Sequence, residues 1–284
     1  MAVPVVFLHS TGTGPSMWER SFAALAHLDV QLVALPNVGY APSASASPSP
    51  SLPCALGRGT TCLVADQVAH LAALLPREPF HLVAHSFGAF LALELLLASR
   101  EPEGAVSGLA SRVRSLWMWE PVLFGALAAT VASDHPDRAK DPLAQSSWLV
   151  SDHVRGGTDP WLALFVDYWN GEGAYAKLPE GARASMRELG WTMFQEVRAT
   201  ALADVPFDAY PIDGPCTLAY GASSPPASRA MVAALARTHP SVHVEAHEGL
   251  GHMAPLTRAR AVMASIAAHL VRHGVTPREP DASK

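Results

Sequence analysis

The sequence has few of the features that mark disulfide-rich, zinc-binding, membrane or nucleic-acid-binding proteins. Its 284 residues contain three cysteines, Cys54, Cys62 and Cys216, too few for a disulfide framework or a cysteine-based zinc site. Its apolar runs are interrupted by proline, glycine or charge before they reach 18 residues, so we expect no transmembrane helix. The net charge of −5 gives no reason to expect nucleic acid or an anionic membrane as a partner.

Cofactor motifs are missing as well. The sequence has no His-Glu-x-x-His and no G-x-G-x-x-G, and the small-residue loop Leu8–Gly14 lacks the lysine of a phosphate-binding loop. Its first residues contain no basic segment ahead of an apolar core, so we expect no signal peptide. These absences predict a cytoplasmic protein without a metal or organic cofactor. We expect Cys54 and Cys62 to be free thiols there, although their spacing would permit a disulfide in an oxidising compartment.

The sequence does have a regular alternation of two apolar patterns. With 49% hydrophobic and 16% charged residues, the chain can form one large core domain, with or without an insertion. Helix-like stripes run from Trp18 to Leu25, from Val64 to Leu75 and from Val262 to Leu270. The strand-like runs are Val3–Leu8, Gln31–Leu35, Phe80–Ala84, Val113–Trp119, Cys216–Tyr220 and Val242–Ala246. This alternation predicts an α/β fold with a doubly wound, mostly parallel sheet.

Two stretches break the alternation and suggest the domain organisation. Residues 41–60 are rich in serine, proline and alanine, which is typical of a long, mobile surface loop. About ninety residues then separate the fourth and fifth strand-like runs, far more than one crossover needs. They include helix-periodic aromatic segments. We therefore expect a core of residues 1–120 and 211–272, a helical cap of residues 121–210 over the carboxyl ends of the strands, and a disordered tail of residues 273–284.

The segment Ala84–Gly88, with the sequence Ala-His-Ser-Phe-Gly, is the most informative part of the chain. It lies between a strand-like run and the long apolar run Ala89–Ala98. A serine flanked by small residues at such a turn is typical of a nucleophile elbow, which makes the Ser86 hydroxyl project from the sheet edge. The N-terminal N–H groups of the following helix would favour negative charge beside it. The alternative interpretation is a buried serine in an ordinary strand-to-helix turn.

A serine hydroxyl needs a base that removes its proton, and the predicted base is His252. It lies in Gly249–Pro255, directly after the last strand-like run, where a loop can return over the sheet edge. The chain has 13 histidines, so this position, rather than the residue type, favours His252. Three other histidines flank the same strand and are interpreted as surface or packing residues: His239, His243 and His247.

The developing oxyanion needs hydrogen-bond donors, and two backbone N–H groups are candidates. One belongs to Phe87, the residue after the serine. The other belongs to Thr11, in the small-residue loop that follows the first strand-like run. His9 is expected to support this loop by hydrogen bonding.

Four segments together resemble the α/β-hydrolase superfamily over nearly the whole chain. His9–Gly12 is similar to the family's His-Gly loop, and Pro36–Ser43 loosely resembles its Pro-Gly-x-Gly-x-Ser segment. Ala84–Gly88 resembles the elbow and Gly249–Pro255 the histidine loop. The resemblance implies a doubly wound sheet with a cap and a triad in the chain order serine, acid, histidine. The first strand-like run corresponds to the strand that normally comes third in the family, so we expect the family's N-terminal hairpin to be absent. A serine nucleophile argues against epoxide hydrolases and haloalkane dehalogenases.

The triad acid departs from the family pattern. Members commonly carry an aspartate after the penultimate strand, where this sequence has Ser224, and serine cannot stabilise an imidazolium as a carboxylate does. Some members carry the acid one strand earlier, and Glu120 follows the strand-like run at that position. We therefore predict Glu120 as the acid. Asp208 and Asp213 are weaker alternatives, because they precede the next strand and so belong to the other end of the sheet.

These residues predict a serine hydrolase that cleaves a small carboxylic ester, lactone or thioester through an acyl-enzyme, with Ser86, Glu120 and His252 as catalytic residues. The expected partner is a small molecule with an apolar or aromatic group. Two alternatives remain open: hydrolysis of a carbon–carbon bond by the same triad, and a non-catalytic binding protein with a decayed triad. Apolar residues of the cap could contact the substrate: Trp148, Trp161, Phe165, Trp169, Trp191 and Met193.

Overall fold

The computed structural model describes residues 2–42, 55–104, 106–130 and 147–278. Within these ranges a single sheet contains six strands in the order β2-β1-β3-β4-β5-β6, and all neighbouring strands are parallel. The strands are β1 (Val3–Leu8), β2 (Val30–Leu35), β3 (Phe80–His85), β4 (Val113–Trp119), β5 (Cys216–Gly221) and β6 (His243–His247). The predicted strands are confirmed, each end lying within one residue of its expected position.

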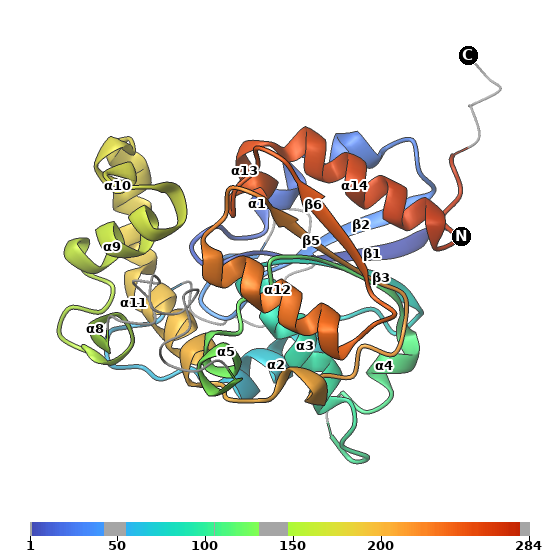
Figure 1. Cartoon of the computed structure of the whole chain (residues 1–284), viewed down its shortest axis with the longest axis horizontal. Coiled ribbons are helices and arrows are strands. Elements are labelled where there is room, and N and C mark those ends of the chain that lie inside the picture. Colours follow the sequence, from blue (N-terminus) through green and yellow to red (C-terminus); the bar gives the residue numbers. More distant parts are fainter. Residues whose placement is uncertain (1, 43–54, 105, 131–146, 279–284) are drawn as a thin grey trace.

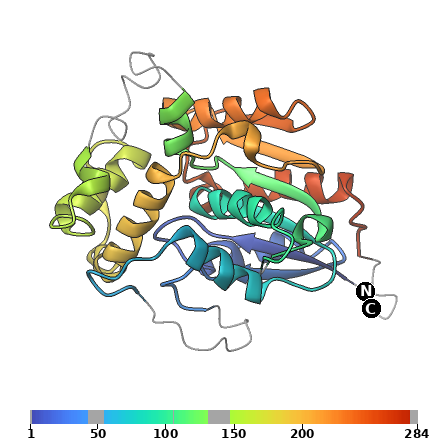
Figure 2. The same cartoon turned by 90° about the horizontal axis from the view of Figure 1, so that it is seen from below.

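Helices cover both faces of the sheet, as the two views in Figures 1 and 2 show. One face packs against α1 (Ser16–Glu19), the 3₁₀ helix η1 (Phe22–Leu25), α13 (Ala254–Thr257) and α14 (Ala259–Arg272). The other packs against α2 (Val64–Leu74), α3 (Phe87–Ala98), α4 (Leu109–Arg112) and α12 (Pro226–Thr238). Along β1, Val5 and Phe7 join the first core whereas Val6 and Leu8 join the second. This alternation of buried side chains confirms a doubly wound sheet.

Helices and connecting turns, without a strand, make up the described residues between β4 and β5, and we call this segment the helical insertion. Its helices are α5 (Phe124–Thr130), α8 (Ser147–Ser151), α9 (Asp159–Asn170), α10 (Ala174–Lys177), α11 (Glu180–Leu202) and the 3₁₀ helix η2 (Phe207–Ala209). Helices α8 to α11 gather at one end of the sheet (Figure 1). Trp161, Met193 and Phe194 are fully buried in an apolar core of their own. Across the described ranges, no helix is long and apolar enough to cross a membrane.

The loop predicted over residues 41–60 is described only in part. Residues 55–60 form neither helix nor strand, but they are attached to their surroundings. The Ala55 N–H donates to the Gly39 carbonyl at 2.8 Å, and the Leu56 N–H donates to Thr192 Oγ1 of α11 at 2.9 Å. Residues 43–54, including Cys54, lie outside the described residues, whereas Cys62 is a free thiol.

Two local predictions need correction. The stripe from Trp18 to Leu25 is not one helix but the end of α1 followed by η1, and both named side chains are buried all the same. The disordered tail expected from residue 273 is wrong for residues 273–278. Val275 is 3% exposed, and the Asp29 N–H donates to the Thr276 carbonyl at 2.9 Å, because this segment pairs beside the start of β2. Residues 279–284 lie outside the described residues.

Candidate functional site

Ser86 lies at a sharp turn between β3 and α3. Its backbone has φ 55° and ψ −116°, a combination that costs energy for a residue with a side chain. The Ser86 N–H donates to the Trp119 carbonyl at 2.9 Å, which fixes the turn to the end of β4. A Cβ at Gly88 would lie 2.7 Å from the carbonyl oxygens of Leu8 and His9, so α3 can approach β1 only with glycine there. The small residue expected after the serine therefore has a steric cause.

The structure brings the three predicted side chains of Ser86, His252 and Glu120 into one hydrogen-bonded line. His252 Nε2 lies 3.0 Å from Ser86 Oγ, and His252 Nδ1 lies 2.7 Å from Glu120 Oε2. Each comes from the carboxyl end of a different strand, because Ser86 follows β3, Glu120 follows β4 and His252 lies in the turn after β6. The residues are 5%, 0% and 2% exposed respectively. A ring with one nitrogen on a carboxylate and the other on a hydroxyl can accept the hydroxyl proton.

Glu120 is held by more than the histidine. Its φ is 46°, and the Gly221 N–H donates to its Oε1 at 2.7 Å. The hydroxyls of Ser224 and Ser228 donate to Oε1 and Oε2, each at 2.5 Å. Burial raises the pKa of Glu120, but the charge and hydrogen bond of His252 and the two serine hydroxyls outweigh burial and lower it below its usual value. Ser224, which stands where the family acid was expected, thus hydrogen-bonds to the carboxylate.

Two aromatic residues lie against the ring of His252. The indole of Trp169, on α9 of the helical insertion, stacks on it with centroids 3.6 Å apart and planes 21° apart. Burial lowers the pKa of His85 well below its usual value, so that ring is neutral, and its Nε2–H donates to the His252 carbonyl at 3.0 Å. Trp169 of the insertion therefore contacts the imidazole itself, whereas His85 of the core binds the backbone that carries it.

The loop after β1 lies beside Ser86. Thr11 lines the same cavities as Ser86, and Phe87 begins α3, where a backbone N–H has no partner within the helix. Burial lowers the pKa of His9 to about 4, so its ring is neutral. Its Nδ1–H donates to the Ser10 carbonyl at 2.9 Å, and its Nε2 accepts the Asn37 N–H at 3.1 Å. The supporting hydrogen bonds expected of His9 are confirmed, whereas the oxyanion role of Thr11 and Phe87 stays a prediction.

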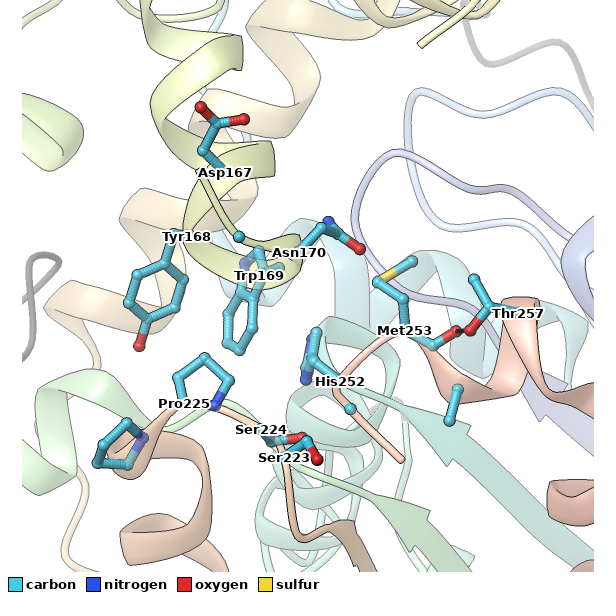
Figure 3. A pocket seen from close by; sticks show the side chains of 14 residues that line it. Asp167, Tyr168, Trp169, Asn170, Ser223, Ser224, Pro225, His252, Met253 and Thr257 are labelled. Carbon is cyan, nitrogen blue, oxygen red and sulfur yellow. Dashed lines mark hydrogen bonds between the residues drawn. The ribbon is translucent and has the colours of Figure 1, made fainter. Parts of the chain in front are cut away.

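A cavity of about 350 Å³ opens at Ser86, and we call it the Ser86 cavity. The loop after β1 and His252 form its floor, and the insertion supplies an apolar wall of Phe165, Val166, Trp169, Leu178, Met186 and Met193. A cleft of about 660 Å³ contains His252 and Trp169 but not Ser86, and Ser223, Ser224 and Pro225 line its other side (Figure 3). The stacked pair thus separates the serine from this outer cleft.

Of the apolar residues predicted to contact the substrate, the structure places some at the Ser86 cavity and others in the core of the insertion. Phe165, Trp169 and Met193 line the Ser86 cavity, whereas Trp161 and Trp191 belong to the core of the insertion. The side chain of Trp148 lies outside the described residues. Sequence reasoning did not identify Ser228 as a partner of Glu120 or the stacking of Trp169 on the histidine. Both depend on how helices distant in sequence pack. The aromatic content of the insertion was a signal for Trp169, whereas nothing in the sequence indicated Ser228.

The other histidines and acids considered lie away from Ser86. His243 and His247 lie 3.3 and 3.6 Å from the Glu245 carboxylate on β6. His239 Nε2 lies 2.8 Å from the Tyr210 carbonyl at the end of α12. Asp208 lies in η2, before β5, and neither it nor Asp213 lines the Ser86 cavity.

Comparison with known proteins agrees with this architecture. The family model of the alpha/beta hydrolase family matches residues 5–265. A thermophilic esterase from Thermogutta terrifontis has a TM-score of 0.58 at 16% identity, covering 96% of this chain and 91% of that one. The enol-lactonase from Burkholderia xenovorans has a TM-score of 0.59 at 15% identity, covering 95% and 92%.

A third solved structure is the thioesterase of the prodiginine biosynthetic pathway in Streptomyces coelicolor. Its TM-score is 0.57 at 16% identity, covering 94% of this chain and 85% of that one. Comparison with curated protein sequences finds no match. At these identities the solved structures show the shared fold, and the family match extends over most of the chain. The chain therefore belongs to the alpha/beta hydrolase family.

Proposed function

We propose that the protein is a serine hydrolase that cleaves a small carboxylic ester, lactone or thioester through an acyl-enzyme. The observation that carries this proposal is the hydrogen-bonded line from Ser86 through His252 to Glu120, at the floor of an apolar cavity. Ser86 Oγ attacks the acyl carbon while His252 Nε2 takes its proton, and Glu120 stabilises the resulting imidazolium. The N–H groups of Thr11 and Phe87 stabilise the oxyanion.

The remaining steps use the same groups in reverse. The tetrahedral intermediate expels the alcohol or thiol, which takes the proton from His252 Nε2 and leaves the acyl group on Ser86. A water molecule then attacks the acyl carbon, and His252 takes its proton and returns it to Ser86 Oγ as the acid departs. The face of Trp169 stabilises the imidazolium in both halves of the reaction. In this proposal residues 121–210 act as the cap that keeps the reacting groups away from bulk water.

Three observations support this proposal. Similar structures include an esterase, a thioesterase and an enol-lactonase. A decayed triad would leave Ser224 without a role, but its hydroxyl donates to the Glu120 carboxylate. The volume of about 350 Å³ is at the lower end for ligand cavities, which favours a small substrate.

A fluorophosphonate probe and a series of p-nitrophenyl esters test the proposal. The wild-type protein should be labelled and should hydrolyse the shorter esters, whereas Ser86→Ala should do neither. Ser115→Ala is the matched control, since Ser115 is also buried and hydrogen-bonded to histidine but lies outside the cavity. Absence of labelling in a folded wild-type protein would favour the binding-protein alternative. Turnover of a vinylogous diketone but not of esters would favour carbon–carbon bond hydrolysis.

A further inference from the structure

A buried carboxyl group of the helical insertion reaches the loop after β1. Glu196 lies on α11 and is 2% exposed. The Tyr40 hydroxyl donates to Glu196 Oε2 at 2.9 Å and accepts the Gly12 N–H at 2.7 Å. Gly12 has φ 75°, and a Cβ there would lie 2.9 Å from Met193 Cε of the same helix. One tyrosine thus connects α11 to the residue that follows Thr11.

Two buried oxygens beside this connection lack partners in the described part of the chain: Glu196 Oε1 and Asn37 Oδ1. The Asn37 Nδ2–H donates to the His9 carbonyl at 3.3 Å, and this hydrogen bond fixes the orientation of the amide. The opposite orientation would place Asn37 Oδ1 against the His9 carbonyl oxygen, and both are acceptors. Asn37 lies close enough to Glu196 for its side chain to affect the pKa of Glu196. A proton on Glu196 Oε1, donated to Asn37 Oδ1, would satisfy both oxygens at once.

The position of Glu196 also favours the neutral acid. Together with Thr11 and Ser86 it lines a small cavity of about 20 Å³. An ionised carboxylate at this place would repel the negative charge that forms on the substrate oxygen, and it would do so in a buried site with little screening. A neutral carboxylic acid keeps the hydrogen bonds to Tyr40 and Asn37 without that repulsion.

We propose that Glu196 is a positioning residue that, as a neutral carboxylic acid, ties α11 to the loops of residues 9–14 and 36–40. Its effect on catalysis rests on the proposed function, because the loop that it holds carries Thr11. The tie through Tyr40 fixes the path of the loop next to the Thr11 N–H. Ionisation of Glu196 breaks the bond to Asn37 and places a negative charge beside the oxyanion.

The titration of the surrounding groups makes this testable. Burial raises the pKa of Glu196 to about 8. Donation from Thr11, Tyr40 and Asn37 favours the ionised form and opposes this rise, but burial outweighs it. Burial raises the pKa of Tyr40 well above its usual value and that of Cys62, which precedes α2, to about 11. Burial lowers the pKa of His9 to about 4. Between pH 6 and 9 these three neighbours therefore keep their charge while Glu196 loses its proton.

The first experiment is a pH–rate profile for p-nitrophenyl acetate hydrolysis. Wild-type kcat should fall above pH 8 by up to about tenfold per pH unit, and Glu196→Gln should lose this alkaline limb. At pH 7, Glu196→Gln should retain most of the kcat, whereas Glu196→Ala should lose about tenfold in kcat with little change in KM. Glu188→Gln makes the same substitution at an exposed position on the same helix and should keep the wild-type profile.

Three results would overturn the proposal: an alkaline limb that persists in Glu196→Gln, full kcat in Glu196→Ala, or Glu196→Gln as impaired as Glu196→Ala at pH 7. If the wild-type protein hydrolysed no ester, this would instead contradict the proposed function. In that case the pH dependence of the Tm still tests whether Glu196 is a neutral acid. With a folded pKa above the unfolded one, the Tm of wild type relative to Glu196→Gln should fall as pH rises from 5 to 8 and then level off. A constant difference would contradict the neutral acid.

Discussion

At each of its two ends the sheet carries a serine that is hydrogen-bonded to histidine, and the two clusters differ in backbone conformation and in charge. At the carboxyl ends, Ser86 Oγ lies 3.0 Å from His252 Nε2. Near the amino ends, Ser115 Oγ of β4 lies 2.7 Å from His81 Nδ1 and 2.8 Å from His269 Nε2. Both serines are buried, so a hydrogen bond between serine and histidine does not by itself distinguish the candidate nucleophile.

The difference lies in the backbone and in the charge. Ser86 has a positive φ and opens into a cavity, whereas Ser115 lies inside a strand and lines none of the cavities described above. His252 contacts a carboxylate, but burial lowers the pKa of His81 to about 4 and that of His269 to about 3. A histidine can take a proton during a reaction only if something stabilises its charge. The Ser115 cluster offers nothing of that kind and is interpreted as a structural network.

The largest expected effect separates the histidines of the two clusters. His252→Ala should lower kcat for an activated ester by about 10⁶, the scale seen when the base or nucleophile of such a triad is removed. His269→Ala should change kcat by less than tenfold but lower the Tm, because Ser115 and Thr217 lose a buried partner. Steady-state kinetics and thermal unfolding of both variants measure this. If His252→Ala and His269→Ala lowered kcat equally, the two clusters could not be assigned different roles.

The second prediction tests the carboxylate itself. Glu120→Gln keeps the shape of the side chain but removes its charge, and its amide can hold the ring in the wrong tautomer. A loss of about 10⁴ in kcat is expected. Glu94→Gln is the control, since that carboxylate also accepts a hydrogen bond, from Tyr210 at 2.9 Å, but on α3 away from the cavity. If Glu120→Gln stayed within threefold of wild type, Glu120 could not be the triad acid.

The sequence predicted the strands and the placement of three site residues because their signals are local. A buried parallel strand is a short apolar run, and the carboxyl ends of such strands meet at one edge, which places Ser86, Glu120 and His252 together. Glu120 followed from the serine at position 224, which left the usual acid position empty. The hydrogen bond between these two residues explains how that departure is accommodated.

Contacts from the helical insertion could not be predicted in the same way. Trp169 and Glu196 approach the site through the packing of helices that lie far from it in sequence, and no spacing rule relates them to His252 or Gly12. The segment around Val275 shows the same limit, because its partners, Leu28 and Asp29, lie at the other end of the chain, just before β2. Local composition indicated a tail, whereas long-range pairing fixed the segment.

A smaller effect is expected at the oxyanion loop. Thr11→Pro removes the backbone N–H and should lower kcat by about 10²–10³ with a smaller change in KM. Thr11→Ala keeps the N–H and serves as the matched control, so its kcat should exceed that of Thr11→Pro by at least tenfold. Kinetics on one activated ester, with circular dichroism to check folding, provide the measurement. Similar values for the two variants would exclude the Thr11 N–H as a donor.

The smallest effect concerns the Ser115 cluster and appears in stability rather than turnover. Burial lowers the pKa of His269 in the folded chain to about 3, whereas the unfolded chain titrates near 6.5. Between these values the unfolded state binds more protons, so the stability contributed by the neutral ring is lost as pH falls below 6.5. Relative to His269→Gln, the wild-type protein should lose on the order of 2 kcal/mol between pH 7 and pH 4. Urea unfolding of both proteins at the two pH values measures the difference. If this difference did not change with pH, His269 would bind a proton as readily in the folded as in the unfolded chain, which would contradict the neutral ring of the Ser115 cluster.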